Sequence, residues 1–117
     1  MKIVKENISI DELKEMSAKM YGDLVKAVID IEQGIMVVDA DLHADEEKQL
    51  LENGSRQQDL WGINIYPHLI GEQFIEFDSM INMRPRQDNR SRSVEDENTR
   101  KKIIEIVNRL IINGIPT

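Results

Sequence analysis

Residues 74–83 alternate between apolar and polar side chains, and this alternation constrains the fold more than any other feature of the chain. Successive side chains of a strand point to opposite faces, so the run predicts one apolar and one polar face. The predicted apolar face holds Ile75, Phe77, Ile81 and Met83, and the polar face holds Glu76, Asp78, Met80 and Asn82. A strand needs a partner, and residues 60–66 are β-rich and end at Pro67. We therefore expect these two segments to pair as an antiparallel hairpin, with Trp61 facing the core.

Two longer segments repeat apolar residues every three or four positions, which is the period of a helix packed on a core. The first begins at a capping box formed by Ser9 and Glu12 and continues to about Ile31. The second is capped by Ser93, carries its stripe between Ile103 and Ile111, and stops at residues 113–116. We expect two long helices here.

Three shorter segments complete the prediction. Residues 35–40 form an apolar strand buried on both faces, and residues 44–52 form a short helix with acidic residues in its first turn. Residues 2–5 alternate weakly and predict a short edge strand. Together, these segments predict an α+β fold: a small, mostly antiparallel sheet of three to four strands with two long helices packed on one face. We expect one domain over residues 1–117, because chains of this length build a single core.

Charge and composition exclude several classes of function. The chain holds 15 Lys and Arg against 22 Asp and Glu, a net charge of −7, and no cysteine. Disulfides, thiolate metal sites and cysteine nucleophiles are therefore excluded. Its apolar runs are too short to span a bilayer and none resembles a secretory signal, so we expect a cytoplasmic protein without membrane contact. The charge divides unevenly, with −10 in residues 1–83 and +3 in residues 84–117.

The arginine loop, residues 84–92, is the first candidate site. It contains Arg84, Arg86, Arg90 and Arg92 against a single aspartate. Guanidinium groups suit bidentate binding of phosphate or carboxylate, so the loop predicts an anion site or a local RNA contact. The alternative is a solvated loop whose arginines pair with acidic groups of the chain itself or of a partner. No aromatic residue lies among the arginines, which makes nucleic acid the weaker interpretation.

The second candidate is the acidic run around His43. In extended form Asp39, Asp41, His43 and Asp45 would share one side, and these are residue types that can ligate a divalent cation or flank an acid–base histidine. The run matches no established metal motif, and acidic residues are ordinary at the start of a helix. No cofactor is implied by any motif of the chain.

The polar face of the predicted sheet is the third candidate. It would bring His43, Asn64, Glu76, Asp78 and Asn82 onto one surface. Neighbouring carboxylates on one strand can raise each other's pKa, as in an acid–base pair. A solvated antiparallel face shows the same alternation without any catalytic role.

Three stretches of the chain together resemble a known family. They are residues 34–38 continuing into 42–45 (Leu-His-Ala-Asp), residues 59–67 (Asp-Leu-Trp-Gly-Ile-Asn-Ile-Tyr-Pro), and residues 75–85 with 89–92. The pattern resembles an uncharacterised family of small bacterial and archaeal proteins, a domain of unknown function. The resemblance implies a free-standing domain in a prokaryotic cytoplasm and carries over no catalytic role. It singles out His43, Asn64, Glu76, Asp78, Arg84 and Arg90.

Three functions follow, and no motif decides whether the protein is an enzyme. We expect a domain that acts through protein–protein contact, and one version of this hypothesis is a homodimer. The alternative is an anion-binding or hydrolytic protein in which the arginine loop meets the Glu76 and Asp78 carboxylates in one pocket. A weaker alternative is RNA contact through the arginine loop, which would be strongly salt-dependent.

Overall fold

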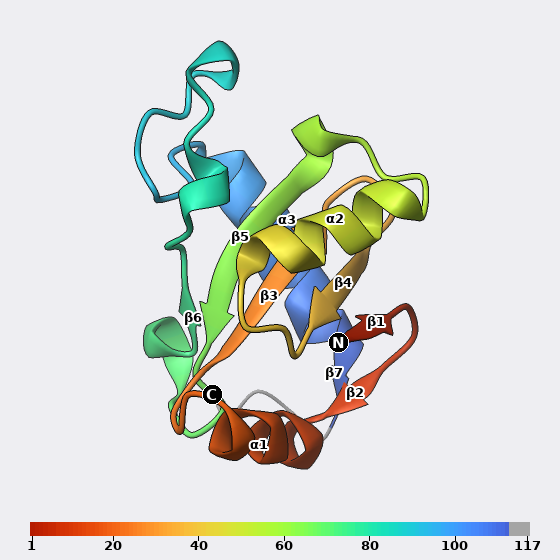
Figure 1. Cartoon of the computed structure of the whole chain (residues 1–117). Helices are drawn as coiled ribbons and strands as arrows, with labels where there is room; N and C mark the ends of the chain where they lie inside the picture. The colour runs from red at the N-terminus through yellow and green to blue at the C-terminus, as the bar shows by residue number, and fades with distance from the viewer. Residues whose placement is uncertain (113–117) are drawn as a thin grey trace.

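The computed structural model describes residues 1–112, and these form an α+β fold around a five-stranded antiparallel sheet (Figure 1). The strands lie in the order β1–β4–β3–β5–β6. Their bounds are β1 Lys2–Val4, β3 Val25–Asp30, β4 Ile35–Val38, β5 Leu60–Ile65 and β6 Ile75–Glu76. The expected class is confirmed, but the expected count of three to four strands is wrong.

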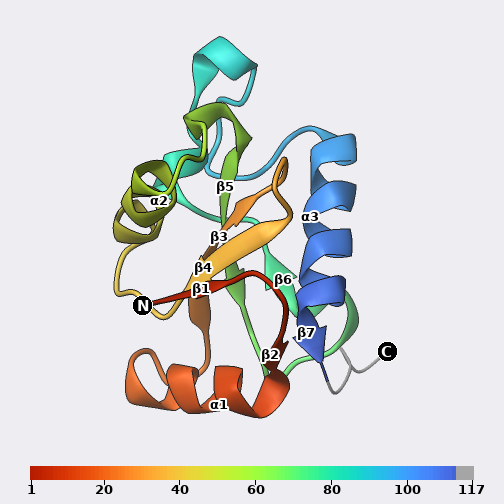
Figure 2. The same ribbon diagram turned by 90° about the vertical axis from the view of Figure 1, so that its right-hand side faces the viewer.

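Three helices cover the sheet, and they do not share a face. The helices are α1 Ile10–Lys19, α2 His43–Glu52 and α3 Glu97–Leu110. Figure 2 shows α2 on one side of the sheet, α3 on the other, and α1 across one end. The prediction of two long helices on one face is therefore wrong in detail. Two short strands, β2 Ile8–Ser9 and β7 Ile111–Ile112, pair in parallel beside α1 and α3.

The layered arrangement gives the sheet a separate apolar cluster on each face. The larger cluster joins the odd-numbered residues of β3 and β5 to α1 and α3, and it includes Trp61, Ile63 and Leu110. The smaller cluster places Leu50 of α2 on the opposite sheet face, against Val28 and Val37. Burial on both faces explains the continuous apolar run of β4, which was predicted correctly.

The predicted long helix over residues 9–31 is wrong beyond its first half. Ser9 does cap α1, accepting the Glu12 amide at 3.0 Å, but the helix ends at Lys19. Gly22 follows in the left-handed region at φ +92°, a conformation that glycine adopts without a steric penalty. The chain then enters β3, the central strand, whose β-branched residues pair with both β4 and β5.

Residues 74–83 do not form the long strand that their alternation predicts. Only β6 pairs with β5, so the expected antiparallel hairpin is confirmed over two residue pairs. Met80–Asn82 then form a 3-10 turn, and Ile81 packs on the α2 side of the sheet while Ile75 and Phe77 pack on the α3 side. The apolar residues of this segment therefore divide between the two faces.

The ends of α3 also differ from the prediction. Asp96, and not Ser93, caps the helix by accepting the Thr99 amide at 2.8 Å. The helix passes into β7 after Leu110, and the predicted stop at residues 113–116 lies outside the described residues. Between residues 1 and 112, no helix is long and apolar enough to cross a membrane.

Candidate functional site

Three of the polar residues predicted for one sheet face, Asn64, Glu76 and Asp78, lie together beside β5 and β6 and form a polar cluster with Tyr66 and Arg92. The Asn64 side-chain amide donates to Glu76 Oε1 at 2.8 Å, and the Tyr66 hydroxyl donates to the same oxygen at 3.0 Å. Asp78 accepts from Arg92 Nε at 2.6 Å. Burial and the bond to Glu76 raise the pKa of Tyr66 to about 12, so its hydroxyl keeps its proton. Both carboxylates are thus held as hydrogen-bond acceptors.

His43 lies at the first position of α2 and is also engaged. Its Nε2 is 2.7 Å from the carbonyl oxygen of Ile63 in β5. A carbonyl only accepts, so Nε2 carries the proton of the neutral ring. Burial lowers the pKa of His43, and the nearby charge of Lys26 acts in the same direction. At neutral pH the ring is therefore an uncharged donor that ties α2 to the sheet.

Asn82 lies apart from this polar cluster, although the sequence predicts it there. Its side chain accepts from the Gly62 amide at 2.8 Å and donates to the Gly62 carbonyl at 2.9 Å. Both Gly62 groups lie on the edge of β5 that β6 leaves uncovered, so Asn82 replaces a neighbouring strand there. The residue is fully buried and its contacts are structural.

The arginine loop does not present its arginines to one point. Arg84 stacks over Trp61, with its guanidinium carbon 4.0 Å from the ring centroid, and donates to the carbonyls of Gln57 and Leu60. Arg92 is paired with Asp78. Arg90 lies 3.7 Å from Asp88 and is 70% exposed, and Arg86 is exposed in the 3-10 turn Pro85–Gln87.

The acidic run around His43 is also spread out. Asp39 lies 3.9 Å from the N-terminal amine, Asp41 accepts from the Tyr21 hydroxyl, and Asp45 is exposed on α2. Within residues 1–112 no three His, Asp or Glu side chains are grouped so as to hold a metal ion.

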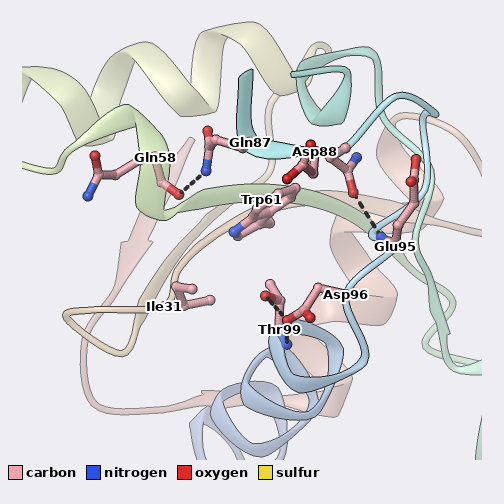
Figure 3. A pocket seen from close by; sticks show the side chains of 9 residues that line it. Ile31, Gln58, Trp61, Gln87, Asp88, Glu95, Asp96 and Thr99 are labelled. Carbon is pink, nitrogen blue, oxygen red and sulfur yellow. Dashed lines mark hydrogen bonds between the residues drawn. The ribbon is translucent and has the colours of Figure 1, made fainter. Parts of the chain in front are cut away.

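A cleft of about 560 Å³ opens beside Trp61, on the α3 side of the sheet, and none of the predicted site residues lines it (Figure 3). Its walls come from the turn Gln57–Asp59, the end of the turn Pro85–Gln87 and the start of α3. The lining residues are Ile31, Gln58, Trp61, Gln87, Asp88, Asn89, Glu95, Asp96 and Thr99. We call this the Trp61 cleft.

Trp61, which lines the Trp61 cleft, carries a hydrogen-bond donor without a partner in the described part of the chain. The residue is only 6% exposed, and its Nε1 has no partner among the described residues. Figure 3 shows this nitrogen on the side of the ring that faces Gln58 and Ile31. A buried donor without a partner loses hydration and gains nothing in return, at a cost of about 1–3 kcal/mol. Such a group is uncommon in a folded protein and marks a place where a ligand acceptor would be favourable.

The other polar groups of the cleft are mostly acidic. Asp88 follows the turn Pro85–Gln87 in the left-handed conformation at φ +58°, which aspartate tolerates better than most residues. Hydrogen bonding by Ser91 and Arg90 lowers the pKa of Glu95, and hydrogen bonding by Thr99 lowers that of Asp96. Glu95 and Asp96 are therefore ionised at neutral pH, and the lining residues include no Lys or Arg.

The sequence contained only one signal for this cleft. Trp61 was predicted to face inward, which is confirmed, because it packs in the larger cluster. Gln58, Gln87, Glu95 and Asp96 carried no recognisable pattern. They meet because the arginine loop folds back over the start of β5, with the Gln87 side chain donating to the Gln58 carbonyl at 3.0 Å.

Fold and cleft together define a small α+β domain with an open, acidic cleft beside its single tryptophan. The chain belongs to the family described as "Protein of unknown function (DUF5674)", whose model matches residues 2–110. The family resemblance expected from the sequence is thereby confirmed, and the family carries no assigned activity. No curated protein and no solved structure matches the chain.

Proposed function

We propose that this protein is a noncatalytic binding domain that receives a segment of a partner protein in the Trp61 cleft. The observation that carries the proposal is the indole N–H of Trp61, which is buried and has no partner in the described chain although Trp61 itself lines an open cleft. Ligand sites commonly combine an apolar wall with a few unpaired polar groups. Here the Trp61 ring and Ile31 supply the apolar wall, and the amides of Gln58 and Gln87 flank it.

The placement of the acid–base groups supports a noncatalytic role. A general base must lie within reach of a bound substrate. Glu76, Asp78 and His43 make their hydrogen bonds beside β5 and β6, through Glu76 Oε1, Asp78 Oδ1 and His43 Nε2. The Trp61 cleft contains none of these three residues. The acid–base groups and the cleft thus lie apart, whereas the hydrolytic alternative needs them together.

The shape of the cleft favours a protein segment over an enclosed metabolite. Its volume of about 560 Å³ has room for a few side chains. It lies open between two surface turns and a helix end, so a bound chain could enter and leave along the surface. A backbone carbonyl of such a segment is a natural acceptor for Trp61 Nε1, as in other modes of peptide recognition.

A random 12-residue peptide library selected on the full chain tests the proposal. The enriched peptides are then measured against two variants, Gln87→Tyr and Gln73→Tyr. Both glutamines end an exposed 3-10 turn, but only Gln87 lines the cleft. We expect Gln87→Tyr to weaken binding at least about tenfold by filling the cleft, and Gln73→Tyr to leave it unchanged. Failure to enrich any peptide, or equal binding by both variants, would overturn the proposal.

A second copy of the chain is one partner that the proposal covers. In that case sedimentation would show self-association that Gln87→Tyr weakens and Gln73→Tyr does not. We place this binding in the cytoplasm on the sequence grounds given above.

A further inference from the structure

We infer that the segment bound in the Trp61 cleft is basic: a Lys or Arg side chain enters among Asp88, Glu95 and Asp96, next to an acceptor that binds Trp61 Nε1. The inference rests on the proposed function and names the chemistry of the partner. It reverses the expectation from the sequence, where the arginine loop predicted an anion site.

The charges that line the cleft are the first argument. Three of the nine lining residues are carboxylates and none is basic. The carboxylates come from two places along the chain, Asp88 after a 3-10 turn and Glu95 with Asp96 before α3, and the fold of the arginine loop brings them together. Complementary charge selects partners and directs their approach, so this cleft favours a cation.

Glu95 and Asp96 each use one carboxylate oxygen for the backbone hydrogen bonds that hold the arginine loop and cap α3. Glu95 accepts the Arg90 and Ser91 amides on the same oxygen, Oε2, at 2.8 and 2.7 Å. Asp96 likewise accepts both groups of Thr99 on Oδ2, at 2.8 Å each. Within residues 1–112, Oδ1 of Asp96 accepts no hydrogen bond and Oε1 of Glu95 accepts no backbone amide, although the Ser91 side chain lies close to the Glu95 carboxylate. An ammonium or guanidinium group can bind these oxygens without displacing the loop or the helix cap.

Three basic residues lie near the carboxylates of the cleft, and none of them prevents cation binding. Lys102 is exposed on α3, and its charge acts on Asp96. Arg84 is fixed on the Trp61 ring by stacking and by two backbone carbonyls, and Glu47 and Asp59 oppose its charge. Arg90 makes a long contact of 3.7 Å with Asp88, and both side chains are largely exposed. Such an exposed surface pair contributes little to stability, so an incoming cation can replace Arg90.

Trp61 supplies the second, independent observation. Its indole N–H is a donor only and therefore needs an acceptor from the ligand. In a basic peptide the backbone carbonyl can meet this donor while the side chain reaches the carboxylates. Gln58 bounds that side of the ring and is exposed, so its side chain can turn aside to admit the acceptor.

A titration followed by two-dimensional NMR on the full ¹⁵N-labelled chain tests the inference. The chain has one tryptophan, so its spectrum holds one indole N–H signal, and that signal reports on the Trp61 cleft alone. The probes are end-capped hexalysine, hexaglutamate and hexaglutamine peptides, together with spermidine as a small amine. We expect hexalysine to move the indole signal, hexaglutamate and hexaglutamine to leave it in place, and spermidine to act only at much higher concentration.

Matched variants separate the cleft from the general acidity of the protein. Asp88→Asn should weaken hexalysine binding about threefold, because asparagine keeps the left-handed turn and loses the charge. Adding Glu95→Gln should bring the loss to about tenfold, since glutamine retains one oxygen to accept the loop amides. Asp45→Asn changes the net charge equally on α2, across the sheet from the cleft, and should leave the affinity unchanged.

The NMR results distinguish a failure of the inference from a failure of the proposed function. If hexaglutamine moves the indole signal as much as hexalysine does, or if Asp45→Asn weakens binding as much as Asp88→Asn, the cationic class is wrong while peptide binding stands. If spermidine matches hexalysine at equal concentration of amine, the cationic class stands and the protein segment is wrong. If no probe moves the signal, the inference is overturned.

Discussion

Glu46 shows how far burial can change one side chain of this protein. It lies on α2 facing the sheet, is fully buried, and accepts the Ala40 amide at 3.2 Å on Oε2. Its other oxygen has no partner in the described chain. Burial raises the pKa of Glu46 to about 10, and the Ala40 bond and the charge of Lys26 oppose this only in part. The native protein therefore holds Glu46 protonated at neutral pH.

We predict that Glu46→Gln stabilises the protein and flattens its pH dependence. The unfolded chain releases the Glu46 proton above a pKa of 4.5, whereas the native state keeps it to about 10. Folding must therefore take up a proton between these values, and the contribution of Glu46 to stability falls as pH rises, by about 1.4 kcal/mol per pH unit. Glutamine stays neutral, so the gain should be near zero at pH 4.5 and about 3 kcal/mol at pH 7.

Urea unfolding at pH 5, 7 and 9 measures this effect. Glu52→Gln is the control, because Glu52 is exposed at the end of the same helix and should change little. Equal stability of Glu46→Gln and the natural protein across the pH range would contradict a buried, protonated Glu46.

At the scale of elements, the sequence predicts segments with a strong local pattern correctly. It does not predict where α1 ends and β3 begins. The strand over β4, the helix α2 and the strand β5 were predicted within one or two residues. The error over residues 9–31 arose because the apolar residues of β3 happened to continue the helical spacing of α1. Glycine only weakens a helix in general, and the role of Gly22 as a helix stop depends on a positive φ that the sequence does not display.

The irregular course of residues 74–83 depends on a close approach that no local pattern encodes. Ser79 lies directly against Gly62 of β5, where an added Cβ would meet Ser79 Cβ and Oγ at 2.6 Å and Ile81 Cγ1 at 3.1 Å. With Ser79 in this place, Asn82 can bind both backbone groups of Gly62. The glycine therefore selects the 3-10 turn over a continued strand.

We predict that Gly62→Ala destabilises the protein by about 2–3 kcal/mol, because the methyl group overfills this contact and strains the Asn82 bonds. Urea unfolding measures the loss. The double variant Gly62→Ala/Ser79→Gly removes the colliding side chain and should recover at least half of it. Additive losses in the two single variants would show that Gly62 and Ser79 are not coupled and that the contact is not the cause.

At the scale of the whole molecule, the layering of helices on the sheet could not be predicted. Each helical stripe requires an apolar surface, but the stripe does not specify which sheet face supplies it. The choice of faces depends on β3, which was assigned to a helix, so the opposite cluster around Leu50 had no predicted counterpart. Without β3 in the predicted sheet, we expected the helices to cover only one of its faces.

The Trp61 cleft escaped prediction for a related reason. Its walls combine residues from three parts of the chain, 58–61, 87–89 and 95–99, with Ile31. Only the folded arginine loop brings them together, through Asn89, which donates to three carbonyls and accepts the Glu95 amide. The candidate residues on the sheet face were easier to foresee, because strand pairing places Asn64 opposite Glu76.

We predict that the two apolar clusters unfold as one cooperative unit, because β3, β4 and β5 contribute side chains to both. Leu50→Ala, in the small α2 cluster, should lower the stability of the whole chain by about 2–5 kcal/mol, as should Leu110→Ala in the large cluster. Urea transitions followed by Trp61 fluorescence, across the sheet from Leu50, should coincide with those followed by circular dichroism. Leu51→Ala, on the exposed side of α2, is the control and should cost far less. A Leu50→Ala protein that loses helical signal before its Trp61 transition would show instead that α2 unfolds independently.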